Sequence, residues 1–118
     1  MKPLIKALVL SVFLTLFTVS AQAQVAASGR ITLLRVHDVG TGYGPPADFI
    51  DVEVIVLLDT QPGKAFGFQL RNDGNRVARQ GQLDLLRDAF NNNWTVTVDH
   101  ITPAGRQNGV IIRTQITK

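Results

Sequence analysis

Hydrophobic and polar residues alternate along most of the chain beyond residue 30. A period of two is typical of a β-strand with one buried face, and these segments are rich in β-branched and aromatic residues. The pattern predicts five strands, at residues 31–39, 49–58, 65–71, 94–101 and 109–117. A short arm, residues 24–29, precedes the first of them.

The second predicted strand changes its pattern part-way along. Asp51 and Glu53 alternate with apolar residues at its start, whereas both faces are apolar from Ile55 onward. A strand with two apolar faces enters a closed core or an interface. Because a monomer would have to cover both faces, the stretch 54–58 also favours oligomerisation.

One segment has helical periodicity instead. In residues 79–91, Leu83, Leu86 and Phe90 recur at spacings of three and four, with Leu85 and Ala89 beside them. This spacing predicts a helix with one apolar stripe. The run of three asparagines at 91–93 is expected to end it.

The element order is therefore β-β-β-α-β-β within one domain, residues 24–118, without a repeat or linker. This order is that of a five-stranded Greek-key barrel of the oligonucleotide/oligosaccharide-binding (OB) type, a mainly β fold. The helix lies between strands three and four, and its apolar face is expected to plug the bottom of the barrel. Trp94, at the start of the fourth strand, is expected to cap the core.

A predicted helix runs into two terminal strands in the passages LDLLRDAFNNNWTVTVDHI and NGVIIRTQI. This last part of the chain resembles small exported OB-fold proteins of bacteria. Among these are the B subunits of AB5-type toxins. The resemblance implies edge-to-edge assembly into rings that bind glycans on host cells. The chain departs from many such subunits because it has no cysteine and therefore no disulfide.

The first 23 residues have the features of a secretory signal peptide. Lys2 and Lys6 precede the uncharged apolar stretch 7–20, and Ala21-Gln22-Ala23 supplies small residues where a signal peptidase cuts. That apolar stretch is shorter than the roughly 20 residues needed to span a bilayer. We expect cleavage after Ala23, export to the periplasm or beyond, and no membrane association afterwards.

The charge of the exported part is nearly balanced. The full chain has a formal charge of +3, but removal of Lys2 and Lys6 leaves 10 basic residues against 9 acidic ones. Affinity for nucleic acid depends mainly on Lys and Arg that neutralise phosphates. Nucleic-acid binding is therefore disfavoured.

The loop GTGYGPPADF, residues 40–49, contains three glycines but lacks the spacing of a dinucleotide or phosphate-binding motif. OB folds bind ligands through the loops that follow strands one and four and through the face of strands two and three. These two loops predict a ligand site made of an aromatic ring and polar side chains. Its candidate residues are Tyr43, Asp48, Arg106, Gln107 and Asn108. The alternative is an ordered turn in which Tyr43 packs back onto the barrel.

Two histidine–aspartate pairs, His37-Asp38 and Asp99-His100, suggest a metal or a hydrolytic site. Neighbours on a strand point to opposite faces, so neither pair chelates one ion as a unit. We interpret these four as solvated strand-end residues, and we expect no metal, no cofactor and no catalytic residue.

Asp51 and Glu53 lie roughly 7 Å apart on one face by strand geometry. They are expected to point outward and to pair with Arg35 or Arg71 on neighbouring strands.

The sequence thus predicts an exported, non-catalytic binding or assembly module whose partner is a glycan or a protein and which forms a homo-oligomer. The alternative is a small periplasmic hydrolase or metal-dependent enzyme that uses His37, Asp38, Asp99 and His100. A further alternative is a protein-interaction or nucleic-acid-binding OB domain.

Overall fold

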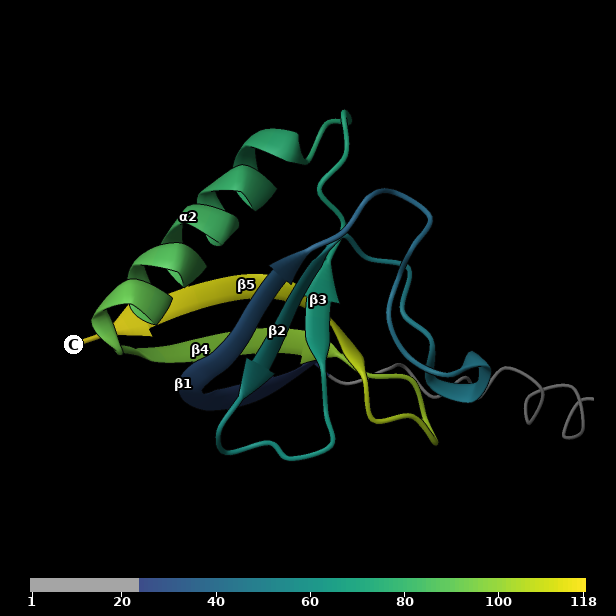
Figure 1. Cartoon of the computed structure of the whole chain (residues 1–118), viewed down its shortest axis with the longest axis horizontal. Coiled ribbons are helices and arrows are strands. Elements are labelled where there is room, and N and C mark those ends of the chain that lie inside the picture. Colours follow the sequence, from purple (N-terminus) through teal and green to yellow (C-terminus); the bar gives the residue numbers. More distant parts are fainter. Residues whose placement is uncertain (1–23) are drawn as a thin grey trace, which may run out of the picture.

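A computed structural model of the protein describes residues 24–118; the predicted signal peptide lies outside the described residues. The described part is mainly β and folds as one sheet with a single α-helix (Figure 1). No helix within it is long and apolar enough to cross a membrane. The elements in chain order are β1 (Gln24–Val36), a 3-10 turn η1 (Pro46–Asp48), β2 (Val54–Leu58), β3 (Phe66–Phe68), α2 (Arg76–Asn92), β4 (Thr95–Ile101) and β5 (Gly109–Thr117).

The five strands form one sheet of mixed orientation in the order β1-β2-β3-β5-β4. The order closes on itself because β1 pairs with β4 as well as with β2. All neighbours are antiparallel except β3 and β5, which are parallel and pair at Phe66–Gly109 and Gly67–Val110. The number of strands, the single helix and its position between β3 and β4 are therefore as predicted.

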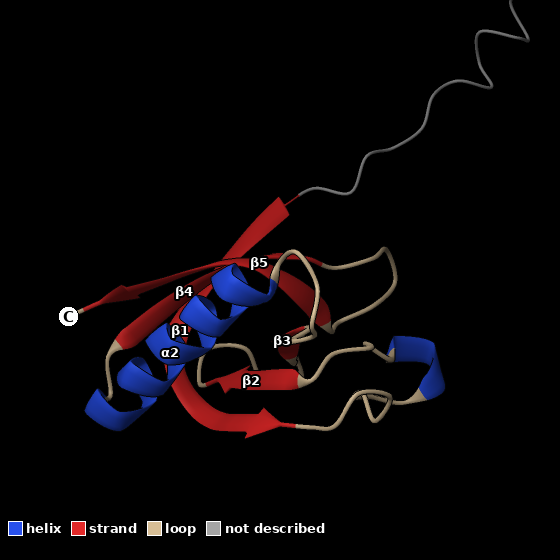
Figure 2. Cartoon of the chain, turned by 90° about the horizontal axis from the view of Figure 1, so that it is seen from above, coloured by secondary structure: helices blue, strands red, loops and turns tan. Residues whose placement is uncertain are grey.

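Strand β1 is longer than predicted and serves two neighbours. Its first half, Gln24 to Arg30, pairs with β4, so the expected arm is part of the sheet. Its second half pairs with β2 from Ile31 onward, with a register shift between Ile31 and Leu33. The strand curves strongly as it passes from one neighbour to the other (Figure 2). Gly29 lies at this crossing, where a side chain would collide with the side chains of Asp59 and Thr60.

The helix begins one turn earlier than predicted and closes the main core. Leu86 and Ala89 are buried among core residues from all five strands, and Leu83 packs against the same cluster. Phe90, which the sequence placed on the apolar stripe, is 46% exposed. The helix is rotated so that Ala89, three residues after Leu86, faces the core in place of Phe90. Asn93 ends the helix in the left-handed conformation that asparagine tolerates, with φ of 56°.

Strand β2 is buried on both faces within the chain. Val54, Val56 and Leu58 point into the main core, whereas Ile55 belongs to a second apolar cluster on the outer side. The connection from β1 to β2 folds back over this outer side and contributes Ile50, Val52 and Tyr43. Residues 49–53, predicted as strand, belong to this connection. The apolar stretch that suggested oligomerisation is thus covered by the chain itself.

The remaining elements agree with the sequence more closely. Strand β3 is shorter than predicted, β4 starts one residue late, and β5 has the predicted bounds. Trp94 packs against the main core, as expected, and the Lys118 ammonium lies 5.1 Å from the centre of its ring.

Candidate ligand-binding groove

The loops that follow β1 and β4 meet, as the sequence predicted. The carboxylate of Asp48 accepts hydrogen bonds from the backbone N–H groups of Gln107 (3.1 Å) and Asn108 (3.0 Å). The Asn108 side-chain amide also donates to the Asp48 carbonyl oxygen at 2.8 Å. Arg106 adds a hydrogen bond from Nη1 to the carbonyl oxygen of Phe49 at 3.2 Å. We call these contacts the loop clasp.

Asn108 also fixes the turn between β2 and β3. It is 4% exposed, and its Oδ1 accepts the backbone N–H of Ala65 at 2.9 Å. Three connections, after β1, β2 and β4, therefore converge on this one buried amide. Asp48 Oδ1 and both polar atoms of the Asn108 side chain take part in this framework.

The glycine-rich stretch is a shaped turn. Gly42 and Gly44 have φ of 59° and 104°, and a side chain at either position would collide with Phe49 or with the Asp48 backbone. Tyr43, between them, bridges to Ile50 through paired backbone hydrogen bonds of 3.0 and 2.8 Å. Its ring is half-buried on the second apolar cluster, as the packing interpretation expected. The Arg35 guanidinium lies 5.6 Å from the ring centre.

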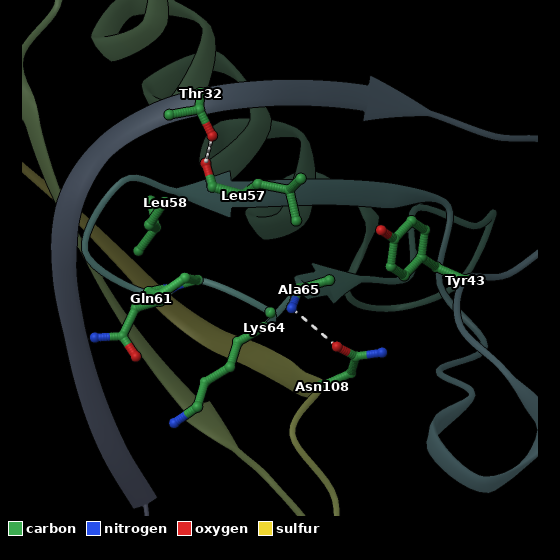
Figure 3. A pocket seen from close by; sticks show the side chains of 10 residues that line it. Thr32, Tyr43, Leu57, Leu58, Gln61, Lys64, Ala65 and Asn108 are labelled. Atoms are coloured by element: carbon green, nitrogen blue, oxygen red, sulfur yellow. Dashed lines mark hydrogen bonds between the residues drawn. The ribbon is translucent and has the colours of Figure 1, made fainter.

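A groove of about 250 Å³ lies where these connections meet (Figure 3). Tyr43 and Asn108 lie toward one end of it, and Gln61 and the end of the Lys64 side chain lie toward the other. Apolar side chains of β2 and of the following turn form much of its wall. The lining residues are Thr32, Tyr43, Leu57, Leu58, Gln61, Pro62, Gly63, Lys64, Ala65 and Asn108.

Of the five predicted site residues, Tyr43 and Asn108 line the groove. Gln107 lies at its rim, since its side-chain oxygen is 3.5 Å from where a side chain on Gly63 would begin. Asp48 and Arg106 support it through the loop clasp. Gln61 and Lys64 were missed, because a Pro-Gly pattern predicts the turn but not what lies beside it.

Two further depressions have similar volumes. One, between α2 and β5, contains Arg79, whose guanidinium lies 3.6 Å from the Asp73 carboxylate. The other lies beside Gly29 and is wide open. Neither is lined by an aromatic side chain. Of these three depressions of residues 24–118, only the first joins a ring, amides and a cation to an apolar wall.

Three of the four residues of the enzyme hypothesis, His37, Asp99 and His100, have separate environments. His37 Nδ1 lies 3.0 Å from the Gly42 carbonyl oxygen, and Asp99 forms an ion pair with Arg113 at 3.3 Å. His100 is 7% exposed, so describing it as solvated was wrong. It packs on Phe66 with ring centres 4.5 Å apart, and its Nδ1 lies 2.9 Å from Thr102 Oγ1. Burial in this setting lowers the pKa of His100.

The predicted pairing of Asp51 and Glu53 with an arginine is present, but Glu53 points inward. Arg71 donates to both oxygens of Glu53, at 2.7 and 3.0 Å, and to Asp51 at 2.9 Å. Glu53 is only 3% exposed because this fork and the Leu70 N–H satisfy its carboxylate. The hydrogen bonds to Glu53 raise the pKa of Arg71 above its ordinary value. The ion pair of Arg71 with Glu53 thus anchors the loop before β2, and we assign it a structural role.

Within residues 24–118, no three histidine or acidic side chains are grouped so as to hold a metal ion. The chain matches no family model, no curated protein and no solved structure. The chemistry of the groove is therefore the basis for assigning a function.

Proposed function

We propose that the protein is an exported, non-catalytic binding module that holds a sugar residue in the groove beside Tyr43 and Lys64. The observation that carries the proposal is the mixed lining of this groove. A sugar ring presents C–H faces that suit the apolar wall of Leu57 and Pro62, and hydroxyls that suit the Tyr43 hydroxyl and the Gln61 amide. No histidine, carboxylate or serine lines the groove, so its chemistry favours binding over hydrolysis.

We further infer that the closed sheet is an OB-type barrel, in keeping with the suggested kinship to exported bacterial OB-fold proteins. OB folds bind through the loops after strands one and four and across strands two and three. The groove adjoins these same elements: Tyr43 follows β1, Asn108 precedes β5, and Leu57 and Ala65 belong to β2 and the turn before β3. The loop clasp holds these parts together before a ligand arrives, which lowers the cost of binding.

A glycan array probed with the purified protein tests the function. Thr32 is exposed on β1 and lines the groove, so Thr32→Trp fills the groove without entering the core. Thr117→Trp, at an exposed position on β5, is the matched control. We expect binding to a subset of glycans that Thr32→Trp abolishes and Thr117→Trp retains. An empty array, or equal binding by both variants, would contradict the proposal.

Assembly into rings stays a separate prediction. The apolar residues of β2 that suggested it are covered within the chain. Size-exclusion chromatography with light scattering measures the oligomer directly, and a monomer would overturn the ring without affecting the groove.

A further inference from the structure

The residues that line the groove carry a positive charge and no negative charge. Lys64 is the one charged side chain among the residues that line it. No carboxylate of residues 24–118 lies within ion-pair distance of Lys64, although five other ion pairs form in the same part of the chain. The Lys64 ammonium is exposed and available to a ligand.

Two acidic residues in the connections that border the groove, Asp48 and Asp59, hydrogen-bond backbone N–H groups. Asp48 accepts two backbone N–H groups in the loop clasp. Asp59 accepts the backbone N–H of Arg30 at 2.8 Å, beside Gly29 and outside this groove. Neither carboxylate lines the groove, so no anionic side chain among the lining residues competes with a ligand for Lys64.

The backbone of Lys64 is held in place on both sides. Its N–H donates to the Gln61 carbonyl oxygen at 3.2 Å, which closes the turn. The next N–H, that of Ala65, is bound by the buried Asn108. The long side chain projects from this fixed point on the same side as Gln61, away from Tyr43 (Figure 3).

We propose that the groove selects a sugar residue that carries a carboxylate, with Lys64 as its counter-charge. This inference rests on the proposed function and specifies its ligand class. The acid group lies at the end with Lys64 and Gln61, and the sugar ring lies along Leu57 toward Tyr43. A free inorganic anion would use Lys64 alone and leave the apolar wall uncovered. The groove volume, below the roughly 300–1,000 Å³ of drug-sized sites, suits one terminal residue of a glycan.

The experiment is an NMR titration of the ¹⁵N-labelled protein with three probes: methyl glucuronide, methyl glucoside and inorganic phosphate. The first two differ only at C6, which is a carboxylate in the glucuronide and a hydroxymethyl group in the glucoside. An exposed charge pair contributes up to about 1 kcal/mol, so we expect glucuronide to bind about three- to five-fold more tightly than glucoside. The preference should decrease at high salt, because exposed pairs are screened.

Two variants assign the preference to its residue. Lys64→Gln keeps a polar side chain of similar reach and should reduce the glucuronide-to-glucoside ratio to about one. Lys118→Gln removes the other lysine of residues 24–118, which lies over Trp94, and should leave the ratio unchanged. Both positions are exposed, so folding is not at risk.

The outcomes separate the two proposals. Equal binding of glucuronide and glucoside, or a preference that survives Lys64→Gln, overturns the acidic-sugar inference while the sugar-binding function stands. Phosphate that shifts the same resonances as strongly as glucuronide also overturns it, since the groove would then be a general anion site. Failure of every glycan on the array removes the proposed function itself.

Discussion

Asp48 and Asn108, 60 residues apart in the chain, bind each other twice: the Asn108 backbone N–H donates to the Asp48 carboxylate, and its side-chain amide donates to the Asp48 carbonyl oxygen. This double contact, in which Asn108 donates both hydrogen bonds, joins the connection before β2 to the connection before β5. Asn108 also holds the turn that carries Lys64, through the N–H of Ala65. The shape of the groove therefore depends on one aspartate–asparagine pair.

Asp48→Ala should loosen this pair. The substitution removes the acceptor of two backbone N–H groups, and an unsatisfied, partly buried donor costs roughly 1–3 kcal/mol. We expect the free energy of unfolding, measured in urea, to fall by about that amount. Asp38→Ala, at an exposed aspartate of the same connection, should change it by less than about 0.5 kcal/mol. Equal effects would mean that the loop clasp does not stabilise the fold.

The strands and the helix could be predicted because their signals are local. Alternation over a few residues marks β4 and β5, and the spacing of Leu83 and Leu86 marks α2. The first half of β1, with its small residues Ala26, Ala27 and Gly29, has no such signal. It is a strand because β4, some 70 residues later, pairs with it along seven positions.

The groove was predicted only in part, because some of its residues are brought together by contacts between distant parts of the chain. Tyr43 and Asn108 could be predicted from the loops that OB folds use. Lys64 and Gln61 could not, because their place beside Asn108 follows from the hydrogen bond to Ala65 and the pairing of β3 with β5. Glu53 was predicted outward because alternate charged positions usually face water. Its burial depends on Arg71, a partner 18 residues away.

Leu86→Ala tests the role of the helix as the cover of the main core. Leu86 is fully buried, and removal of a buried leucine side chain usually costs about 2–5 kcal/mol. We expect a loss of that size in urea unfolding. Val77→Ala is the matched control on the same helix, since Val77 is 87% exposed and should change stability by less than about 0.5 kcal/mol. A small loss at Leu86 would show that α2 does not seal the core.

Two glycines should respond in opposite directions to alanine. Gly81 lies within α2 and faces open space, so Gly81→Ala should stabilise the protein by about 0.5–1 kcal/mol. At Gly67 in β3 a new methyl group would lie 2.5 Å from the Val54 carbonyl oxygen and 2.6 Å from a Val52 methyl. Gly67→Ala should therefore destabilise it. The midpoint of thermal unfolding of each variant, compared with the wild type, checks both expectations. A change of the same sign in both variants would contradict the close strand packing at Gly67.

His100 should make the stability depend on pH. Burial against Phe66, and secondarily the positive charge of Lys64, lowers the pKa of His100 from its ordinary 6.5, while Asp99 opposes the change. The unfolded chain therefore takes up a proton near pH 6.5, whereas the folded chain keeps the imidazole neutral to lower pH. Since the unfolded state binds more protons in that interval, the contribution of neutral His100 to the free energy of unfolding is complete above pH 6.5. It is lost as the pH falls from there toward the folded-state pKa.

His100→Gln isolates this effect, because glutamine does not titrate and can still hydrogen-bond Thr102. One proton changes the free energy of unfolding by at most about 1.4 kcal/mol per pH unit. We expect the wild type to lose stability more steeply than the variant between about pH 7 and pH 5, in urea titrations at several pH values. His37→Gln removes the other histidine and should keep the steep slope of the wild type. If His100→Gln also keeps that slope, a different group is responsible for the acid sensitivity, and the burial of His100 does not control it.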